Sequence, residues 1–420
     1  MERYHGTYTG SVETGRSLYG INLGRLLRNI NILFAILYMA VYTTPYFRYL
    51  LDSRFRLIGM GLLGLWICST VLVYRIRRIS SFSVFIFFNI FVFGLMTFAG
   101  AGNVNSIIAG YVAFWSFLFI FEVYFQAGDY KAIGIITKVM IAVICITCIT
   151  TIIASLIYPN ISKLTYKDSA TGENVANQLN VGGFDYIAGA CVLAPIFMVL
   201  VFKQKKRLYL IPLILCVVAT FMSGYTIDFL VLCIGIICFL YSNKSGKLNA
   251  TKIFFVFLTI IFVIFLAKNS INIADFIGKN NEHLAGRFRE INSFLNGDLN
   301  DGTDLAYRIT LYKRSIGTFL NHLLVGVGPY YFEGNHGVGD HSQIFDDMAR
   351  YGMIGVIAYA IALYCFKHWL SRIKHDSGKQ LSLMIPYISF VVLSFVNPTL
   401  ILPILGLVLF FILPGLYFAD

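Results

Sequence analysis

Long apolar runs separated by short polar connections are the dominant pattern along this chain. Each run is close to the roughly 20 residues with which an α-helix crosses a bilayer. The pattern therefore predicts an all-α polytopic membrane protein of about 12 transmembrane helices. The pairs 208–222 with 227–242 and 381–397 with 399–418 are predicted to form tight hairpins, because only turn residues separate their members. The predicted spans are 30–46, 57–74, 82–99, 107–126, 132–158, 183–202, 208–222, 227–242, 253–267, 344–366, 381–397 and 399–418.

Two polar segments are too long to be simple connections between helices, 159–182 and 268–343. The second contains two amphipathic stretches, 284–295 and 305–324, with apolar residues at helical spacing. Such helices are expected to lie along a membrane surface. We therefore predict a single integral membrane domain over residues 1–420, with 268–343 as a large loop within it.

Composition and charge support a membrane protein and orient it. The 420 residues are 58% hydrophobic and only 13% charged, whereas soluble domains carry about 25% charged residues. The net charge of +12 fits Lys and Arg gathered in loops on one side, some of them near anionic lipids. This bias predicts cytoplasmic N- and C-termini and an outer position for 268–343. No basic and aromatic module typical of nucleic-acid binding is visible.

Several arginines occur where this orientation rule disfavours them. They are Arg287, Arg289, Arg308 and Arg314 in the large outer loop, together with a smaller group at 47–56. Taken singly, each fits an ordinary paired or solvated arginine. As a set they suit a pyrophosphate, because guanidinium groups remain charged and donate bidentate hydrogen bonds to phosphate oxygens.

The Gly-rich segment 326–355 follows these arginines and contains His341. An imidazole there can accept a proton from a sugar hydroxyl or donate one to a phosphate oxygen; alternatively it is an ordinary interfacial histidine. Asp346, Asp347 and Arg350 lie one helical turn further on, where Arg350 can pair with either acid. Such charges form either a satisfied structural pair or the wall of a polar cavity. Gly352 is expected to serve close packing.

The spacing of these residues resembles a known signature. His341-Ser342, nine further residues and then Gly352-Met-Ile-Gly355 are similar to the motif shared by O-antigen ligases and Wzy-type O-antigen or capsular polysaccharide polymerases. The Arg308 helix leading into Gly326-Val-Gly328 also resembles that family. One departure is the hairpin turn 223–226, which lacks the arginine that many relatives carry. In this chain, Arg48, Arg54 or Arg56 is expected to take the phosphate-binding role of that arginine.

The resemblance implies a GT-C-like glycosyltransferase of the bacterial inner membrane that needs neither metal nor cofactor. Its substrate would be an undecaprenyl-pyrophosphate-linked glycan, polymerised on the outer face, and a chain-length regulator is a possible partner. Ligation of the glycan to lipid A-core is the alternative within the family, and a lipid-linked glycan flippase is the alternative of another class. The implied catalytic residues are His341 and Arg308, and the implied substrate-binding residues are Arg287, Arg289, Arg314, Asp347 and Arg350.

Overall fold

The computed structural model describes residues 23–74, 104–158, 161–164, 170–241, 268–278, 285–286, 288–289, 292–293, 296, 304–328, 337–377 and 384–419. These residues form helices and connections and no β-strand. The longer helices are α1 (Leu23–Thr43), α3 (Phe55–Tyr74), α5 (Val104–Gln126), α6 (Tyr130–Ile157), α9 (Phe184–Met198), α10 (Leu210–Met222), α11 (Thr226–Tyr241), α15 (Asp304–Asn321), α16 (Gln343–Ser377) and α17 (Met384–Val396). The shorter ones are α2 (Pro45–Leu51), α7 (Ile161–Leu164), α8 (Ala170–Gln178), α13 (Ser270–Gly278), α18 (Pro403–Leu407) and α19 (Leu413–Gly415).

The described helices confirm the membrane character of the chain. Five of them are long and apolar enough to cross a bilayer: Leu23–Thr43, Phe55–Tyr74, Tyr130–Ile157, Phe184–Lys203 and Gln343–Ile373. Shorter apolar helices, such as Arg207–Met222 and Ile227–Leu240, lie among them. The predicted spans 82–99 and 253–267 lie outside the described residues, so the count of about 12 spans stays a prediction.

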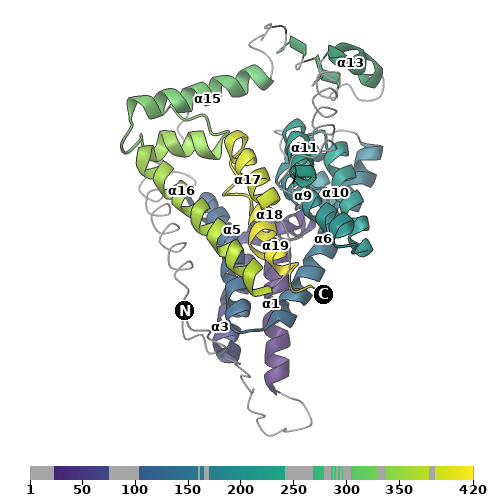
Figure 1. The fold of residues 1–420 in the computed structure, drawn as a ribbon, viewed down its shortest axis with the longest axis vertical. Coiled ribbons are helices and arrows are strands. Elements are labelled where there is room, and N and C mark those ends of the chain that lie inside the picture. Colours follow the sequence, from purple (N-terminus) through teal and green to yellow (C-terminus); the bar gives the residue numbers. More distant parts are fainter. Residues whose placement is uncertain are drawn as a thin grey trace.

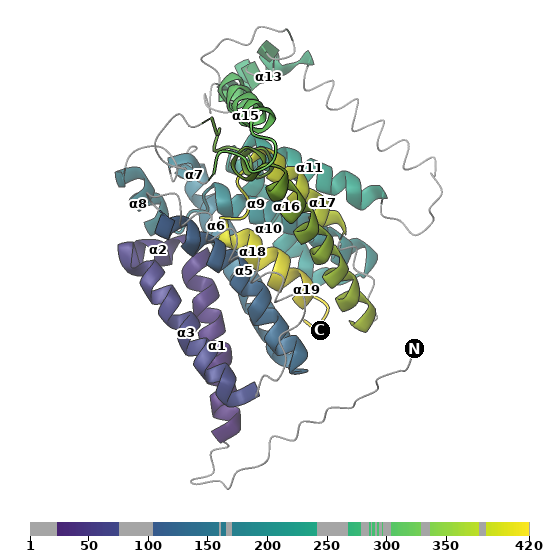
Figure 2. The same ribbon diagram turned by 90° about the vertical axis from the view of Figure 1, so that its left-hand side faces the viewer.

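The centre of the bundle is formed by α9 and by the C-terminal helical segment Pro403–Gly415 (Figures 1 and 2). Helix α9 contacts α10, α11, α17 and α18, while α18 also contacts α1 and α5. Every residue from 404 to 417 is buried. A helix that is apolar on all sides is buried either in protein or in lipid, and here other helices bury it. The stretch predicted as a span over 399–418 is therefore a shorter interior helix, preceded by a connection over 397–402.

Helix α15 lies across one end of the bundle, the end at the top of Figure 1, where α13 also lies. Its bounds, Asp304–Asn321, confirm the helix predicted over 305–324. It packs against α16. Of the other amphipathic stretch, 284–295, only the pairs 285–286, 288–289 and 292–293 are described, and all three are helical.

Helix α16 is broken at Gly352, where the sequence predicts one uninterrupted span over 344–366. The backbone there has φ 59° and ψ −150°, a conformation that essentially only glycine adopts. The turn after α15 enters the break: the Val327 amide donates to Ala349 O at 3.0 Å and the Gly328 amide to Arg350 O at 2.9 Å. Gly352 thus allows another segment to approach α16 closely, as expected, but that segment is the turn after α15 rather than another helix.

Replacing Gly352 with alanine tests the importance of the break. A Cβ at this position would lie 2.5 Å from the Leu324 carbonyl carbon, and the backbone conformation alone costs about 1–3 kcal/mol for other residues. We expect Gly352→Ala to lower the unfolding temperature of the detergent-solubilised protein by several degrees.

Gly317→Ala is the matched control. Gly317 lies inside α15 with nothing within 4 Å of the added Cβ, so alanine stabilises the helix by up to about 1 kcal/mol. Equal unfolding temperatures for the two variants would show that the break is not a structural requirement.

Candidate functional site

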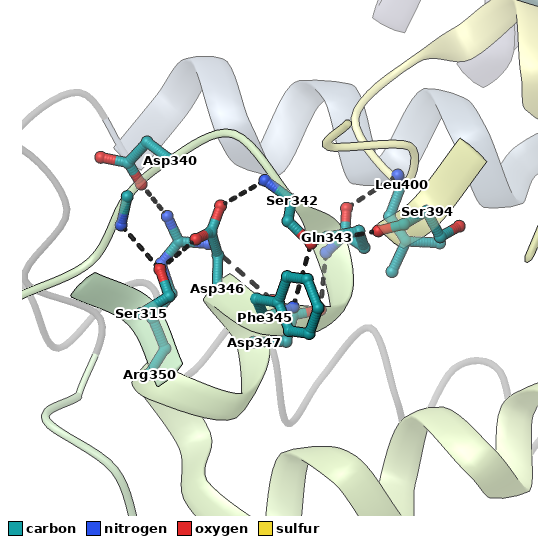
Figure 3. Close-up of polar contacts among 11 residues, drawn as sticks. Ser315, Asp340, Ser342, Gln343, Phe345, Asp346, Asp347, Arg350, Ser394 and Leu400 are labelled. Atoms are coloured by element: carbon teal, nitrogen blue, oxygen red, sulfur yellow. Dashed lines mark hydrogen bonds and ion pairs between the residues drawn. The ribbon is translucent and has the colours of Figure 1, made fainter. Parts of the chain in front are cut away.

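Asp346 fixes the segment 337–342 against α15 at the start of α16 (Figure 3). Its carboxylate accepts hydrogen bonds from the Ser315 hydroxyl at 2.6 Å and from the Ser342 amide at 2.8 Å. The same Ser315 oxygen accepts a hydrogen bond from the Gly339 amide at 2.8 Å. Asp346 is only 1% exposed. A buried carboxylate needs such donors. Asp346 therefore holds α15, the segment 337–342 and the start of α16 together.

Gln343 connects the start of α16 to the connection 397–402. Its side-chain amide donates to Asp347 at 2.6 Å, and its carbonyl oxygen accepts from the Leu400 amide at 3.0 Å. The Gln343 backbone amide donates to Asn397 O at 3.1 Å. Because both the amide and the carbonyl group of the Gln343 side chain are hydrogen-bonded, Gln343 fixes the start of α16 against the connection 397–402.

Arg350 is buried next to these residues, and only 5% of its surface is exposed. Its guanidinium forms ion pairs with Asp340 and, at 3.8 Å, with Asp347. The pairing expected between Arg350 and Asp347 is therefore present, while Asp346 bonds to Ser315 instead. A buried charge requires this compensation. The contacts agree with the structural alternative for this pair, and its role toward a substrate stays a prediction.

His341 is half-buried beside α15. Its Nδ1 lies 3.0 Å from the Asp340 carbonyl oxygen, and its ring meets that of Tyr307 edge-on, with centroids 6.1 Å apart. Because a carbonyl only accepts hydrogen bonds, Nδ1 carries the proton and Nε2 keeps its lone pair. Burial, followed by the positive charge of Arg308, lowers the pKa of His341. The imidazole is therefore neutral, and able to accept a proton, near neutral pH.

Arg308 is half-buried and weakly held. Its Nη1 lies 3.5 Å from Val396 O and 3.4 Å from Asn397 Oδ1, beyond the usual range for a good hydrogen bond. Tyr312 donates to the same Val396 carbonyl at 3.1 Å. A guanidinium carries five N–H donors. Within the described structure, most of those of Arg308 are thus available to a ligand.

The structure brings some of the predicted residues together and separates others. Arg308, Arg314, His341, Asp347 and Arg350 lie on α15, on α16 or in the segment just before α16. Arg314 is exposed on α15 and its charge acts on Asp340. Arg289 instead approaches Asp275 of α13 to 3.7 Å, both side chains being largely exposed. Arg287 lies outside the described residues.

Of the smaller arginine group, Arg48 has a specific partner. Its guanidinium donates to Asp185 at 2.7 Å, which joins α2 to the first turn of α9. Arg54 and Arg56 are exposed. Of the three arginines, Arg48 therefore has the most restricted position.

Asp228 was not predicted as a site residue. It lies in the first turn of α11, is 0% exposed, and neither carboxylate oxygen has a hydrogen-bond partner. It interacts electrostatically with Arg308 and Asp185. The signal was available in the sequence, because an acidic residue inside an apolar hairpin is costly and marks a functional site by default.

The segment that carries these residues matches a known family. Residues 211–360 match the family model described as O-antigen ligase. The matched segment runs from α10 into α16 and so includes Asp228, Arg308, His341 and Arg350. This match supports the O-antigen ligase/polymerase superfamily for the chain. No curated protein matches this chain.

Among the described residues, no group of three or more His, Cys, Asp or Glu side chains is placed to hold a metal ion.

Removing the Ser315 hydroxyl tests the junction at Asp346. Ser315→Ala leaves the Gly339 amide and one Asp346 oxygen without the hydrogen bonds they have now. Unsatisfied buried groups cost about 1–3 kcal/mol each, so we expect a clear drop in unfolding temperature. Ser371→Ala is the control, since that hydroxyl bonds only to the Lys367 carbonyl on an exposed face of α16. A drop no larger than in the control would contradict a structural role for the junction.

Proposed function

We propose that this protein polymerises lipid-linked oligosaccharide repeat units by block glycosyl transfer. Two residues within the segment that matches the O-antigen ligase family carry this proposal: Arg308, a weakly held cation, and His341, whose pKa is lowered by burial and by the charge of Arg308. Members of that family are glycosyltransferase-like enzymes of O-antigen processing. The substrate class is a glycan linked to polyprenyl pyrophosphate, specifically undecaprenyl pyrophosphate.

The chemistry follows from these two groups. The acceptor hydroxyl attacks C1 of the donor sugar while the bond from C1 to the pyrophosphate oxygen breaks. His341 Nε2 takes the proton of the hydroxyl, and the bonding electrons leave with the polyprenyl pyrophosphate. Arg308 stabilises the negative charge that develops on this leaving group, with Arg314 as a second cation on the same helix. Arg287 and Arg289 would extend this binding surface along the loop.

A metal ion is not required in this scheme, because the arginine side chains supply the positive charge that a metal would otherwise contribute. We also propose a GT-C-like arrangement, in which many membrane helices support a site at one end of the bundle. The position of α15 across that end (Figure 1) is consistent with it.

The proposed location is the outer face of the bacterial inner membrane, with both termini in the cytoplasm. The orientation rests on the distribution of Lys and Arg between alternate loops. Surrounding lipids and a chain-length regulator are the proposed partners. The product would be O-antigen or capsular polysaccharide.

Polymerisation is preferred over ligation of the finished glycan to lipid A-core on two features. The loop that follows Gly326-Val-Gly328 is short, and Asp346-Asp347 follow His341 closely. Both reactions use the same donor, and their chemistry is identical at C1.

Deleting the gene in its source cell, and complementing it with variants, tests the reaction class. For a polymerase, the deletion leaves surface glycan of a single repeat unit, and wild-type complementation restores the ladder of long chains. His341→Ala and Arg308→Ala should not restore it, because removing a general base or a charge-stabilising group typically costs about 10²–10⁴-fold in rate.

Gly317→Ala and Ser371→Ala serve as controls that should restore the ladder, and immunoblots of membranes confirm equal amounts of all variants. Long chains that remain on the lipid carrier in the deletion strain would indicate a ligase. Repeat units retained on the cytoplasmic face would indicate a flippase. A full ladder from both His341→Ala and Arg308→Ala would contradict the site.

The pH dependence of chain extension in proteoliposomes distinguishes the two roles of His341. Its pKa is lowered from the usual value of about 6.5 by burial and by Arg308, so the neutral, proton-accepting form persists to lower pH. For a base, the rate should stay level from about pH 8 to about pH 6.5 and fall only below that. A proton donor would instead lose activity as the pH rises through the His341 pKa. Substrate binding measured over the same range is the control for pH effects on Arg-phosphate contacts.

A further inference from the structure

The end of α15 and the residues that follow it, 320–325, which we term the apolar turn, expose a group of large apolar side chains. Leu320, Leu323, Leu324 and Val325 are each more than half exposed, and Leu324 is 75% exposed. The exposed side chains earlier on α15 carry polar groups: Tyr307, Thr310, Lys313 and Arg314. A contiguous exposed apolar patch marks a surface that contacts a protein or a membrane.

The apolar turn continues into an exposed apolar side of α16. The Met353 amide donates to Leu323 O at 2.7 Å, so the two segments are adjacent at the break in α16. Further exposed apolar side chains follow Met353 at helical spacing, Ile354, Ile357 and Ile361. Because Gln343–Ile373 is one of the helices long and apolar enough to cross a bilayer, this side of α16 is expected to face lipid. The apolar turn extends the same surface.

The length of α16 places the apolar turn at a boundary of the hydrocarbon layer. Arg372 is exposed near the far end of α16, where a basic side chain is expected at the opposite boundary. Lys367, just before it, is also exposed and can reach that boundary with its flexible side chain. Residues 352–372 span about 30 Å at 1.5 Å per residue, which equals the thickness of the hydrocarbon core. The break at Gly352, and the turn beside it, therefore lie at the boundary on the side of α15.

The backbone of the apolar turn is suited to this position. The His322 amide donates to Thr318 O at 3.0 Å, the Gly326 amide donates to His322 O at 3.0 Å, and Leu323 O accepts from Met353. Backbone groups without partners are costly in hydrocarbon, so a turn that bonds these groups internally can approach the acyl chains. The polar side chains of Asn321 and His322 suit the headgroup region.

We infer that the apolar turn inserts into the leaflet at this end of the bundle, between headgroups and acyl chains, and anchors α15 to the bilayer. The partner is lipid rather than protein for two reasons. The apolar surface of the turn is continuous with the exposed apolar side of a helix that can cross the membrane, and it lies at the level that the length of α16 gives for the boundary. Amphipathic helices bind membrane surfaces at the same depth.

The anchor also constrains Arg308. This residue lies on α15 about 18 Å before Leu320, at 1.5 Å per residue. Because α15 lies across the end of the bundle (Figure 1), an anchor at its end holds Arg308 close to the level of the lipid phosphates. If the proposed function is correct, the pyrophosphate of a lipid-linked substrate lies at that level. The anchor itself does not depend on the proposed function.

Tryptophan fluorescence in reconstituted vesicles tests the anchor. Leu324→Trp is compared with Ile361→Trp on α16 and with Thr310→Trp on the polar part of α15. The vesicles consist of phosphatidylethanolamine and phosphatidylglycerol, with or without bromine on the acyl chains, because bromine quenches tryptophan on contact. The wild type supplies the background for subtraction, since Trp66, Trp115 and Trp369 are all buried.

The fluorescence added by Leu324→Trp should be quenched by bromolipid as strongly as that of Ile361→Trp, whereas Thr310→Trp should show no quenching above the background. Bromine near the headgroup should quench Leu324→Trp more than bromine deep in the chain. The order should be reversed for Ile361→Trp, which lies about 13 Å below Gly352 and so near the middle of the hydrocarbon core.

Val325→Trp repeats the measurement on the next exposed side chain, and unfolding temperatures equal to that of the wild type show that the variants are folded. Quenching of Leu324→Trp and Val325→Trp no stronger than that of Thr310→Trp would overturn the inference. A blue-shifted emission without quenching would also overturn it, because a second copy of the chain would then cover the turn. Neither measurement involves glycosyl transfer, so failure of the proposed function would leave these results unchanged.

Discussion

The structure depends on one constraint, that backbone groups released by the break in α16 need hydrogen-bond partners. A helix broken at Gly352 exposes the carbonyl groups of Ala349 and Arg350, and in an apolar surrounding each would be costly. The turn 322–328 supplies the amides that these carbonyls require, and in return the Met353 amide donates to Leu323 O at 2.7 Å. Since this turn directly continues α15, the break determines where α15 crosses the bundle. The position of Arg308 follows from it.

The charged groups around this junction fall into two kinds, and the difference matters for function. Asp346, Asp347 and Arg350 are buried and have protein partners, although one oxygen of Asp347 makes no hydrogen bond. Arg308, in contrast, has only long contacts to Val396 and Asn397. Charges with partners stabilise the fold, whereas a weakly held charge such as Arg308 is a candidate for binding a ligand. His341 is held at Nδ1 by the Asp340 carbonyl group.

Much of this could be predicted from the sequence, because hydrophobic periodicity and turn residues act locally. The helix over 304–321, the hairpin turn at 223–225 and the pairing of Arg350 with Asp347 are all consequences of spacing along one segment. The break at Gly352 could not be predicted, since a glycine among apolar residues equally fits a packed helix. Neither could the interior position of Pro403–Gly415, because an apolar run of that kind does not distinguish lipid from protein neighbours.

The contacts missed at the site are all long-range in sequence. Ser315 meets Asp346, Arg48 meets Asp185, and Arg308 acts on Asp228, and no local pattern connects the members of these pairs. The helix bundle creates them by bringing the first turns of α9 and α11 to the same end as α2 and α15. Polar groups at this end of the bundle therefore come from four helices that are far apart in the sequence.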